Sequence, residues 1–457
     1  MENKIKRCKE YTLKEKTEIV KKFREKLEEI KDTEKCLESI QELVVSQIQN
    51  QGFIDFNISD HVSPYVIGQA LLKLNRKSVR GLDGVDIYNR LKQGVRVCKA
   101  ISKRIEKGFY HPGAYKVVEF VKDPSEPSNL RRIGIFSTTE KVIQRLLKDI
   151  LTPIYEPLFL SNSFAYRPAK STFLATEYIS KSLSLDKFRF CVKIDIKKYF
   201  DSIDHDNIVR ILSEKVKSPE IIRYIEEYLK SSKLDRDEYI ENSRGTPQGS
   251  VLGPELSNIY LHYVLDKPIS EEYPEVDFVR FADDIVFFTK TKEDALKLHR
   301  FIISRLNEYK LDISNKIHQY LFDLDKEEVH FLGFTIKKEN NTYRVIPNER
   351  RIIDKCQKFS NILYETLSKY GDLSVIDLRE YKGQEIPKKI LKVSIFKQID
   401  KFKLSIQKYR SSTVEQSNII TEIKLVIGEL KAHLFNYISD RSKIRSVLRY
   451  AENRLTG

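Results

Sequence analysis

Two short β-prone runs separated by only three residues are the feature that most constrains how this chain can fold. Val276–Phe281 and Ile285–Phe288 are rich in Val and Phe, and only Ala282, Asp283 and Asp284 stand between them. Runs that lie so close together predict a tight hairpin with two acidic side chains at its tip. Because turns tolerate Asp, the pattern alone is also typical of a solvated turn without a chemical role.

A second acidic element changes that interpretation. Residues 190–196 are predicted to form a buried strand in which Asp195 stands near the end, and residues 197–204 lead into a helix. A carboxylate placed there is costly without a cation. Two-metal phosphoryl transfer needs two divalent ions about 3.5–4 Å apart, and carboxylates from neighbouring strands can hold them. Asp195, Asp283 and Asp284 therefore predict a site for two Mg²⁺ ions, with Mn²⁺ as the substitute ion. Asp201 and Asp204 are instead interpreted as structural, since Asp caps helices well.

Composition narrows the partner. The chain of 457 residues has a formal net charge of +15 and a pI near 9.2, which favours a polyanionic partner such as nucleic acid. No run of 18 apolar residues occurs, so no membrane partner is expected. Five scattered cysteines without a C-x-x-C pair argue against a disulfide framework and a zinc ribbon, and predict a cytoplasmic location. The motifs of nucleotide-driven motors and zinc proteases are absent.

The chain divides into three parts by its periodicity. Residues 11–51 have helical spacing without Pro or Gly, and predict a helical N-terminal extension. From Lys77 to about Lys338, helix-like and strand-like segments alternate, which is typical of a catalytic α/β body. Residues 351–457 carry 21 Lys/Arg against 12 Asp/Glu and predict a basic helical module, although charge runs are usually solvated faces.

Four motifs, in order along the chain, resemble those of the reverse transcriptases, specifically the bacterial group II intron-like branch. The resemblance runs from about Gly81 to Phe334. The last motif, Arg280–Asp284, resembles the family's Y-A-D-D. The other three are similar to its S-Y-G-F-R-P, its first palm motif and its G-T-P-Q-G-x-x-x-S-P helix entry: Ser163–Pro168, Lys193–His205 and Gly245–Pro254. Phe281 replaces the usual Tyr, Gly253 replaces a Ser, and Arg132 and Phe136 replace prolines of the family's R-P-L-G-I-P. None of these departures removes a metal ligand.

The resemblance implies roles for individual residues. Phe200, five residues after Asp195, matches the steric gate that excludes a ribose 2′-hydroxyl; a buried core aromatic is the alternative interpretation. Lys316 matches a lysine that can protonate the departing pyrophosphate, with an exposed loop lysine as the alternative. By the same resemblance, Ile196 is expected among the metal-binding residues. The residues expected to bind the incoming deoxynucleoside triphosphate (dNTP) are Phe200, Lys122, Arg131, Gln248 and Gly249.

The family's fold, α+β with the right-hand arrangement of fingers, palm and helical thumb, is expected here, and Val329–Phe334 resembles its primer-grip hairpin. The implied divisions are a helical N-terminal extension (1–75), fingers (76–148), first palm segment (149–200), connection (201–247), palm with primer grip (248–345) and basic thumb (346–457).

The expected function is RNA-directed DNA synthesis, with RNA template, DNA product and dNTPs as partners. By elimination the chain looks like a free-standing bacterial enzyme of phage defence that works with a dedicated non-coding RNA, because maturase-type tails and retron signatures are absent. An RNA-copying RNA polymerase and a non-catalytic RNA-binding protein on a polymerase fold are the alternatives. The number of subunits is left open, a homo-oligomer included.

Overall fold

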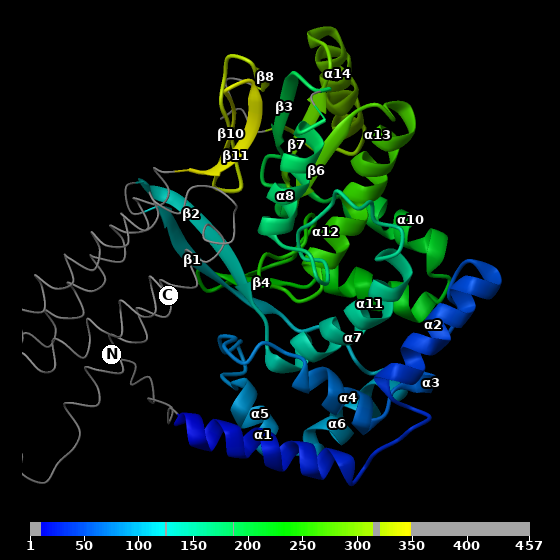
Figure 1. Ribbon diagram of the computed structural model, residues 1–457. Coiled ribbons are helices and arrows are strands. Elements are labelled where there is room, and N and C mark those ends of the chain that lie inside the picture. Colours follow the sequence, from blue (N-terminus) through cyan, green and yellow to red (C-terminus); the bar gives the residue numbers. More distant parts are fainter. Residues whose placement is uncertain (1–10, 124–125, 186, 314–319, 349–457) are drawn as a thin grey trace, which may run out of the picture.

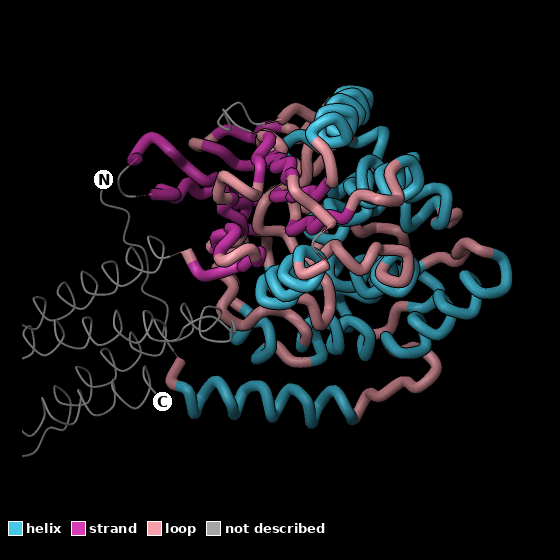
Figure 2. The backbone as a smooth tube through the Cα atoms, turned by 45° about the horizontal axis from the view of Figure 1, so that its top comes forward, coloured by secondary structure: helices cyan, strands magenta, loops and turns pink. Residues whose placement is uncertain are grey.

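The computed structural model describes residues 11–123, 126–185, 187–313 and 320–348. Within them it shows an α+β molecule in which the strands gather on one side and most helices on the other (Figure 2). The predicted thumb lies outside the described residues, apart from its first three. In the part of the chain that is described, no helix is both long and apolar enough to cross a bilayer.

Residues 11–51, where the sequence predicts a helical extension, contain two helices. α1 (Leu13–Glu28) begins with a capping box in which Thr12 and Glu15 bond to each other's backbone N–H groups. α2 (Leu37–Gln51) begins after a break and ends at Gly52, whose φ of 80° closes the helix in the left-handed conformation. Phe23 of α1 and Val44 of α2 are buried in the hydrophobic core that also contains palm residues.

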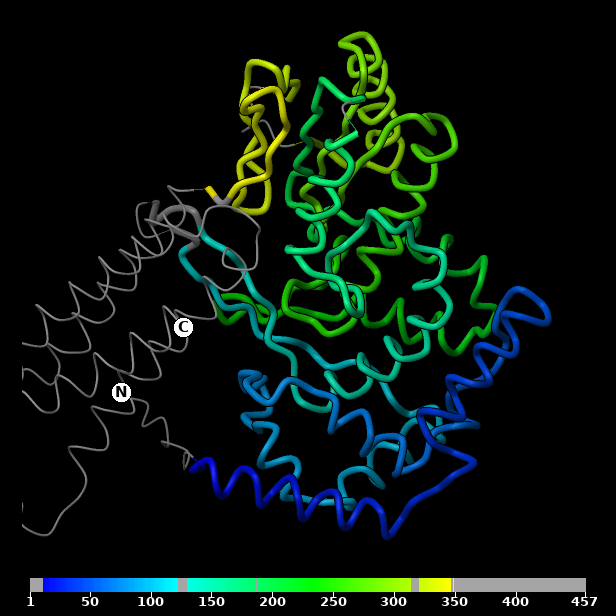
Figure 3. Tube along the Cα trace, in the orientation of Figure 1, coloured from blue at the N-terminus to red at the C-terminus, as the bar shows by residue number. Residues whose placement is uncertain are grey.

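Five helices follow and form the helical end of the molecule, opposite the strands β9–β11 (Figure 3). α7 is the central one, since most of its residues are buried and it contacts α2, α4 and α12. The bounds are α3 (Ile58–His61), α4 (Pro64–Leu72), α5 (Ile87–Lys92), α6 (Val95–Glu106) and α7 (Thr138–Tyr155).

A long hairpin projects from this end toward the β9–β11 sheet (Figure 1). Its strands pair antiparallel, and the shorter strands β4 and β5 extend the sheet in the order β2-β1-β4-β5. The bounds are β1 (Tyr115–Asp123), β2 (Glu126–Ile135), β4 (Lys233–Asp235) and β5 (Glu238–Ile240). Phe136, where the related family has a proline, is buried just after β2 and stacks on Tyr115, with ring centroids 4.6 Å apart.

The central sheet has four antiparallel strands in the order β6-β7-β3-β8. Its bounds are β3 (Phe190–Asp195), β6 (Asp277–Phe281), β7 (Asp284–Thr289) and β8 (Leu321–Asp323). Val286, Phe287 and Phe288 of β7 are fully buried, because α8 (Thr172–Leu183) contacts β6 and α14 (Lys292–Glu308) contacts β3 and β7. This packing fixes the strand register on which the acidic site depends.

The remaining elements connect the central sheet to the rest of the molecule. They are the helices α9 (Tyr199–Ser202), α10 (His205–Lys215), α11 (Pro219–Leu229), α12 (Gly253–Leu261), the π-helix η1 (His262–Asp266) and α13 (Lys267–Glu272), and the strands β9 (Val329–Phe331), β10 (Phe334–Glu339) and β11 (Thr342–Pro347). The last three form a separate sheet in the order β11-β10-β9.

Candidate active site

The predicted hairpin is present, and its register places the three acids together. Phe281 pairs with Asp284, so Ala282 and Asp283 alone form the turn. On the other side of β7, Asp195 at the end of β3 pairs directly with Asp284. Directly opposed residues of an antiparallel pair have their Cβ atoms about 5 Å apart, and like charges there repel. Two carboxylates thus face each other across neighbouring strands, with a third one residue away.

The turn itself is strained. Ala282 has a φ of 60°, a left-handed conformation that favours glycine at the first position of a two-residue hairpin turn. A non-glycine residue held there costs on the order of 1 kcal/mol or more and persists only when its surroundings enforce it. Ala282 is buried, so the surrounding structure imposes this conformation on the turn that carries Asp283.

Burial and charge repulsion act together on Asp283. Burial, which is the larger cause, and the nearby carboxylates of Asp195 and Asp284 raise the pKa of Asp283 to about 6, while its own backbone N–H and Arg131 act in the opposite direction. A raised carboxyl pKa in a cluster of acids is typical of a functional site. Burial and like charges disfavour the ionised form, and such a costly arrangement is kept where a ligand or a reaction requires it.

The chemistry of this donor set fits hard divalent cations. Carboxylate oxygens are the preferred ligands of Mg²⁺, and a cation between Asp195 and Asp284 would offset their repulsion. In the described residues no three His, Cys, Asp or Glu side chains converge closely enough to form a preformed metal cage. The backbone register brings the acids together.

Two predicted nucleotide-binding residues meet beside the acids. The Arg131 side chain on β2 donates from Nε to Oε1 of Gln248 at 3.3 Å. The Gln248 carbonyl in turn accepts from the N–H of Gly134 at 2.6 Å. Gly249 has a φ of 97°, and a Cβ there would lie 2.6 Å from the Ile133 side chain. The close approach that requires this glycine is thus to β2, and its predicted contact with the nucleotide stays a prediction.

Phe200 lies between the first acid and the loop that contains Gln248. Its ring is half-buried, and its carbonyl accepts from the N–H of Thr246 at 2.7 Å. Tyr199 contacts it edge-on, with centroids 5.7 Å apart. A half-buried aromatic at this place fits the steric gate better than a core aromatic would, since part of the ring remains open to a ligand.

The other predicted residues have mixed outcomes. Ile196 is buried, and its N–H donates to the carbonyl of Asp283 at 3.4 Å, so its backbone borders the acids. Asp204 caps α10 and pairs with Lys310, which confirms its structural interpretation. Asp201 lies inside α9 and is not its cap. Lys122 lies on β1, where no side-chain position is described, and Lys316 falls outside the described residues.

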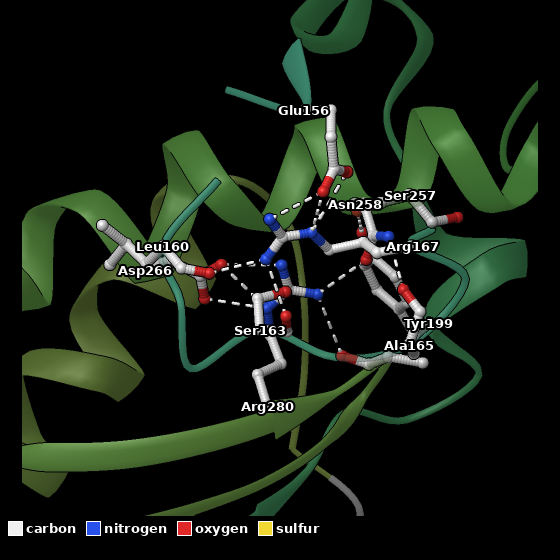
Figure 4. A network of polar contacts seen from close by, with 11 residues as sticks. Glu156, Leu160, Ser163, Ala165, Arg167, Tyr199, Ser257, Asn258, Asp266 and Arg280 are labelled. Carbon is white, nitrogen blue, oxygen red and sulfur yellow. Dashed lines mark hydrogen bonds and ion pairs between the residues drawn. The ribbon is translucent and has the colours of Figure 1, made fainter. Parts of the chain in front are cut away.

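A buried ion pair stands behind the strained turn (Figure 4). Arg280 and Asp266 are both fully buried, and the guanidinium makes three hydrogen bonds of 2.6–2.9 Å to the carboxylate. Arg280 also donates to Oδ1 of Asn258 at 3.0 Å and to the carbonyl of Ala282 at 3.5 Å. Asn258 donates onward to the carbonyl of Ala165 at 2.8 Å. The pair thus joins η1, α12 and the Ser163–Pro168 loop to the hairpin that carries Asp283.

Sequence reasoning missed this network and one exposed side chain next to it. Arg280 and Asp266 are 14 positions apart, and only the π-helix brings the acid under β6. Tyr166, in a motif that was recognised but given no role, forms an edge-on contact with Phe200, with ring centroids 6.2 Å apart. The place of Tyr166 inside a recognised motif was the signal that the sequence offered.

The predicted primer-grip hairpin also forms. Phe331 pairs with Phe334, and the two turn residues Leu332 and Gly333 have φ values of 52° and 86°. Positive φ at both positions is the pattern of a type I′ hairpin turn. Nζ of Lys193 on β3 donates to the carbonyl of His330 at 2.7 Å, which ties the hairpin to the central sheet beside the acids.

An antiparallel sheet with acids at a hairpin tip and on the adjoining strand, flanked by a projecting β-hairpin and backed by helices, defines the right-hand class of nucleic-acid polymerases. Residues 121–336 match the family model "Reverse transcriptase (RNA-dependent DNA polymerase)". Residues 121–336, just under half of the chain, therefore form a reverse transcriptase domain, and the predicted group II intron-like recognition is confirmed for this part of the chain. The defence setting stays a prediction. The predicted α+β polymerase fold is confirmed for the described residues, and the predicted thumb lies outside them.

Named relatives point to the same branch. The group II intron-encoded protein LtrA of Lactococcus lactis subsp. cremoris is 34% identical over 205 residues, 44% of this chain and 33% of that protein. An uncharacterized 91 kDa protein in a cob intron of Schizosaccharomyces pombe is 33% identical over 202 residues, 43% of this chain and 23% of that one. Protein YkfC of Escherichia coli K12 is 24% identical over 243 residues, 45% of this chain and 63% of YkfC. The chain thus spans a third or less of the length of the first two.

Proposed function

We propose that this protein is an RNA-directed DNA polymerase that extends a DNA 3′ end from dNTPs on an RNA template with the help of two Mg²⁺ ions. The observation that carries the proposal is the register of the central sheet, which sets Asp195 opposite Asp284 and puts Asp283 at the adjoining turn. The family match over residues 121–336 supports the same reaction. Asp195, Asp283 and Asp284, with the backbone of Ile196 beside them, would hold the ions.

Other residues of the chain are proposed to bind the triphosphate and the sugar and to protonate the pyrophosphate. When bound, the ions would activate the attacking 3′-oxygen and neutralise charge on the leaving pyrophosphate. Arg131 supplies a guanidinium next to the acids for the triphosphate, and its bond to Gln248 orients both side chains toward the same space. Phe200 closes that space below the sugar. Lys122 and Lys316 are proposed to assist, as triphosphate contact and as proton donor to pyrophosphate.

The direct test is incorporation of labelled dNTPs on an RNA template with a DNA primer, in Mg²⁺ and in EDTA. We expect template-dependent synthesis that needs the metal and disappears in the double variant Asp283→Ala/Asp284→Ala. Phe109→Ala is the matched control, because Phe109 is 68% exposed and lies outside the site. Undiminished synthesis by the double variant would overturn the assignment of these acids.

Nucleotide preference separates the proposal from the RNA polymerase alternative. Phe200→Ala is expected to reduce the preference for dNTPs over ribonucleotides by about ten- to a hundredfold, which is the usual range when a small steric group is removed from a pocket. The measurement is the ratio of kcat/KM for dGTP and GTP on one template. Equal use of both nucleotides by the unsubstituted protein would favour the RNA polymerase instead.

The biological setting is proposed on the sequence alone. Cytoplasmic phage defence with a dedicated non-coding RNA as template is consistent with the basic charge of the chain and its similarity to intron-type enzymes. Sequencing of the nucleic acid that co-purifies with the full chain tests it. We expect a single recurrent RNA. Complementary DNA should accompany it in the unsubstituted protein and be absent in Asp283→Ala/Asp284→Ala. A random RNA population would contradict the proposed setting.

A further inference from the structure

Tyr166 has a backbone conformation that a bulky residue rarely adopts. Its φ is 61°, in the left-handed region, and its side chain is 48% exposed. The two preceding residues, Phe164 and Ala165, are buried. A left-handed tyrosine costs on the order of 1 kcal/mol or more, so the loop must be held from elsewhere.

The residues on both sides of Tyr166 are held by the buried network (Figure 4). The carbonyl of Ala165 accepts from Nδ2 of Asn258 at 2.8 Å. Arg167 forms a forked ion pair with Glu156, with hydrogen bonds of 2.9–3.1 Å, and donates from Nη1 to the carbonyls of Leu160 and Ser163. With its neighbours fixed in this way, Tyr166 is held half-exposed beside Phe200.

The ring that is presented lies against the proposed sugar gate. The rings of Tyr166 and Phe200 meet edge-on, with centroids 6.2 Å apart and an interplanar angle of 85°. Tyr199 contacts Phe200 edge-on as well, at 5.7 Å. Phe200 thus contacts two tyrosines, the fully buried Tyr199 and the half-exposed Tyr166. Such edge-to-face pairs contribute beyond simple burial and fix the orientation of a ring.

The charges of the site reach the same tyrosine. Burial raises the pKa of Tyr166 first, Asp283 raises it further, and Arg131 opposes both. The hydroxyl therefore lies in the field of an acid on the hairpin tip and of a guanidinium on β2. No role in the site was assigned to Tyr166 from the sequence, although its position joins Phe200, Asp283 and Arg131.

From this arrangement we propose that Tyr166 is a positioning residue for sugar selection: its ring holds Phe200 in the orientation that excludes a 2′-hydroxyl. The inference rests on the proposed polymerase function and adds a specificity determinant to it. The strained loop conformation is the structural cost of presenting this ring.

Tyr166→Gly is the informative variant, because glycine adopts a φ of 61° without strain and the change removes the ring but not the backbone position. The measurement is kcat/KM for dGTP and for GTP on an RNA template. We expect about a tenfold loss of the preference for dGTP, with the thermal melting temperature retained. Tyr166→Phe, which keeps the ring, is expected to retain the preference.

A double-variant cycle with Phe200→Ala distinguishes positioning from an independent contact. If Tyr166 acts through Phe200, adding Tyr166→Gly to Phe200→Ala should change the dGTP/GTP ratio no further. Additive effects, or an unchanged ratio in Tyr166→Gly alone, would overturn the inference while the unsubstituted protein still synthesises DNA. Absence of any synthesis by the unsubstituted protein would overturn the proposed function and this inference with it.

Discussion

Asp283→Asn is expected to abolish DNA synthesis and yet to make the metal-free protein more stable at neutral pH. Burial and the neighbouring acids raise the pKa of Asp283 to about 6, against an ordinary value of 3.8. The folded protein therefore binds this proton more tightly than the unfolded chain does. Between these two values the free energy of unfolding falls as pH rises, and the loss is complete above about pH 6. Asn removes the charge, so the variant should gain on the order of 2–3 kcal/mol at pH 8.

Chemical denaturation in EDTA at pH 5 and pH 8 measures this effect. The stability difference between variant and parent should be largest at pH 8 and about half as large at pH 5, because at pH 5 the carboxyl is mostly protonated in the folded parent but already ionised in the unfolded chain. Asp206→Asn, an exposed change of the same kind in the first turn of α10, is the control and should show no such pH dependence. A variant that is less stable than its parent at pH 8 would contradict the proposed cost of ionising Asp283 in the metal-free protein.

Mg²⁺ should reverse the order of stability. A ligand that binds only the folded state stabilises it by an amount that grows with its concentration over Kd. The parent is expected to gain melting temperature in millimolar Mg²⁺, less so below about pH 6, where protons compete for Asp283. Asp283→Asn should gain little at either pH. Incorporation by the variant should fall by about a thousandfold or more, because each lost metal contact removes several kcal/mol of transition-state stabilisation.

The parts of the site that could be predicted are those set by local sequence. The hairpin follows from two β-prone runs with a short separation, and the opposition of Asp195 to Asp284 follows once both strands are buried side by side. The break between α1 and α2 has no local signal, because residues 29–36 contain neither Pro nor Gly. The bounds of fingers, palm and thumb stay predictions.

The parts that could not be predicted depend on contacts between distant residues. Gly249 is predicted to contact the nucleotide, and the structure adds a close approach to β2, more than 100 positions earlier, that the sequence does not reveal. Arg280 stands in a recognised motif, yet its partner Asp266 becomes visible only when η1 turns that carboxylate under β6. Tyr166 has the same dependence, since its exposure results from bonds made by its neighbours and not from its own sequence pattern.

Arg280→Met is expected to destabilise the protein by about 3–5 kcal/mol, the usual cost of leaving one partner of a buried ion pair unpaired. Arg280 and Asp266 are both fully buried, so neither water nor another cation can replace the guanidinium without rearrangement. The turn should also relax, because Arg280 contacts the carbonyl of the strained Ala282. Urea denaturation measures the loss, and Arg223→Met is the control. Arg223 pairs with Glu227 on the surface of α11 and is expected to contribute only about 0.3–0.5 kcal/mol.

Arg280→Met/Asp266→Leu separates the two roles of this pair. Replacing both charges by apolar groups removes the unpaired carboxylate, so most of the lost stability should return. DNA synthesis should not return with it, because no guanidinium then joins Asn258 to the carbonyl of Ala282 and holds the turn that carries Asp283. A double variant that is as active as its parent would show that the pair serves the fold alone. A double variant no more stable than Arg280→Met would show that hydrogen bonds to Asn258, and not the unpaired charge, account for the loss.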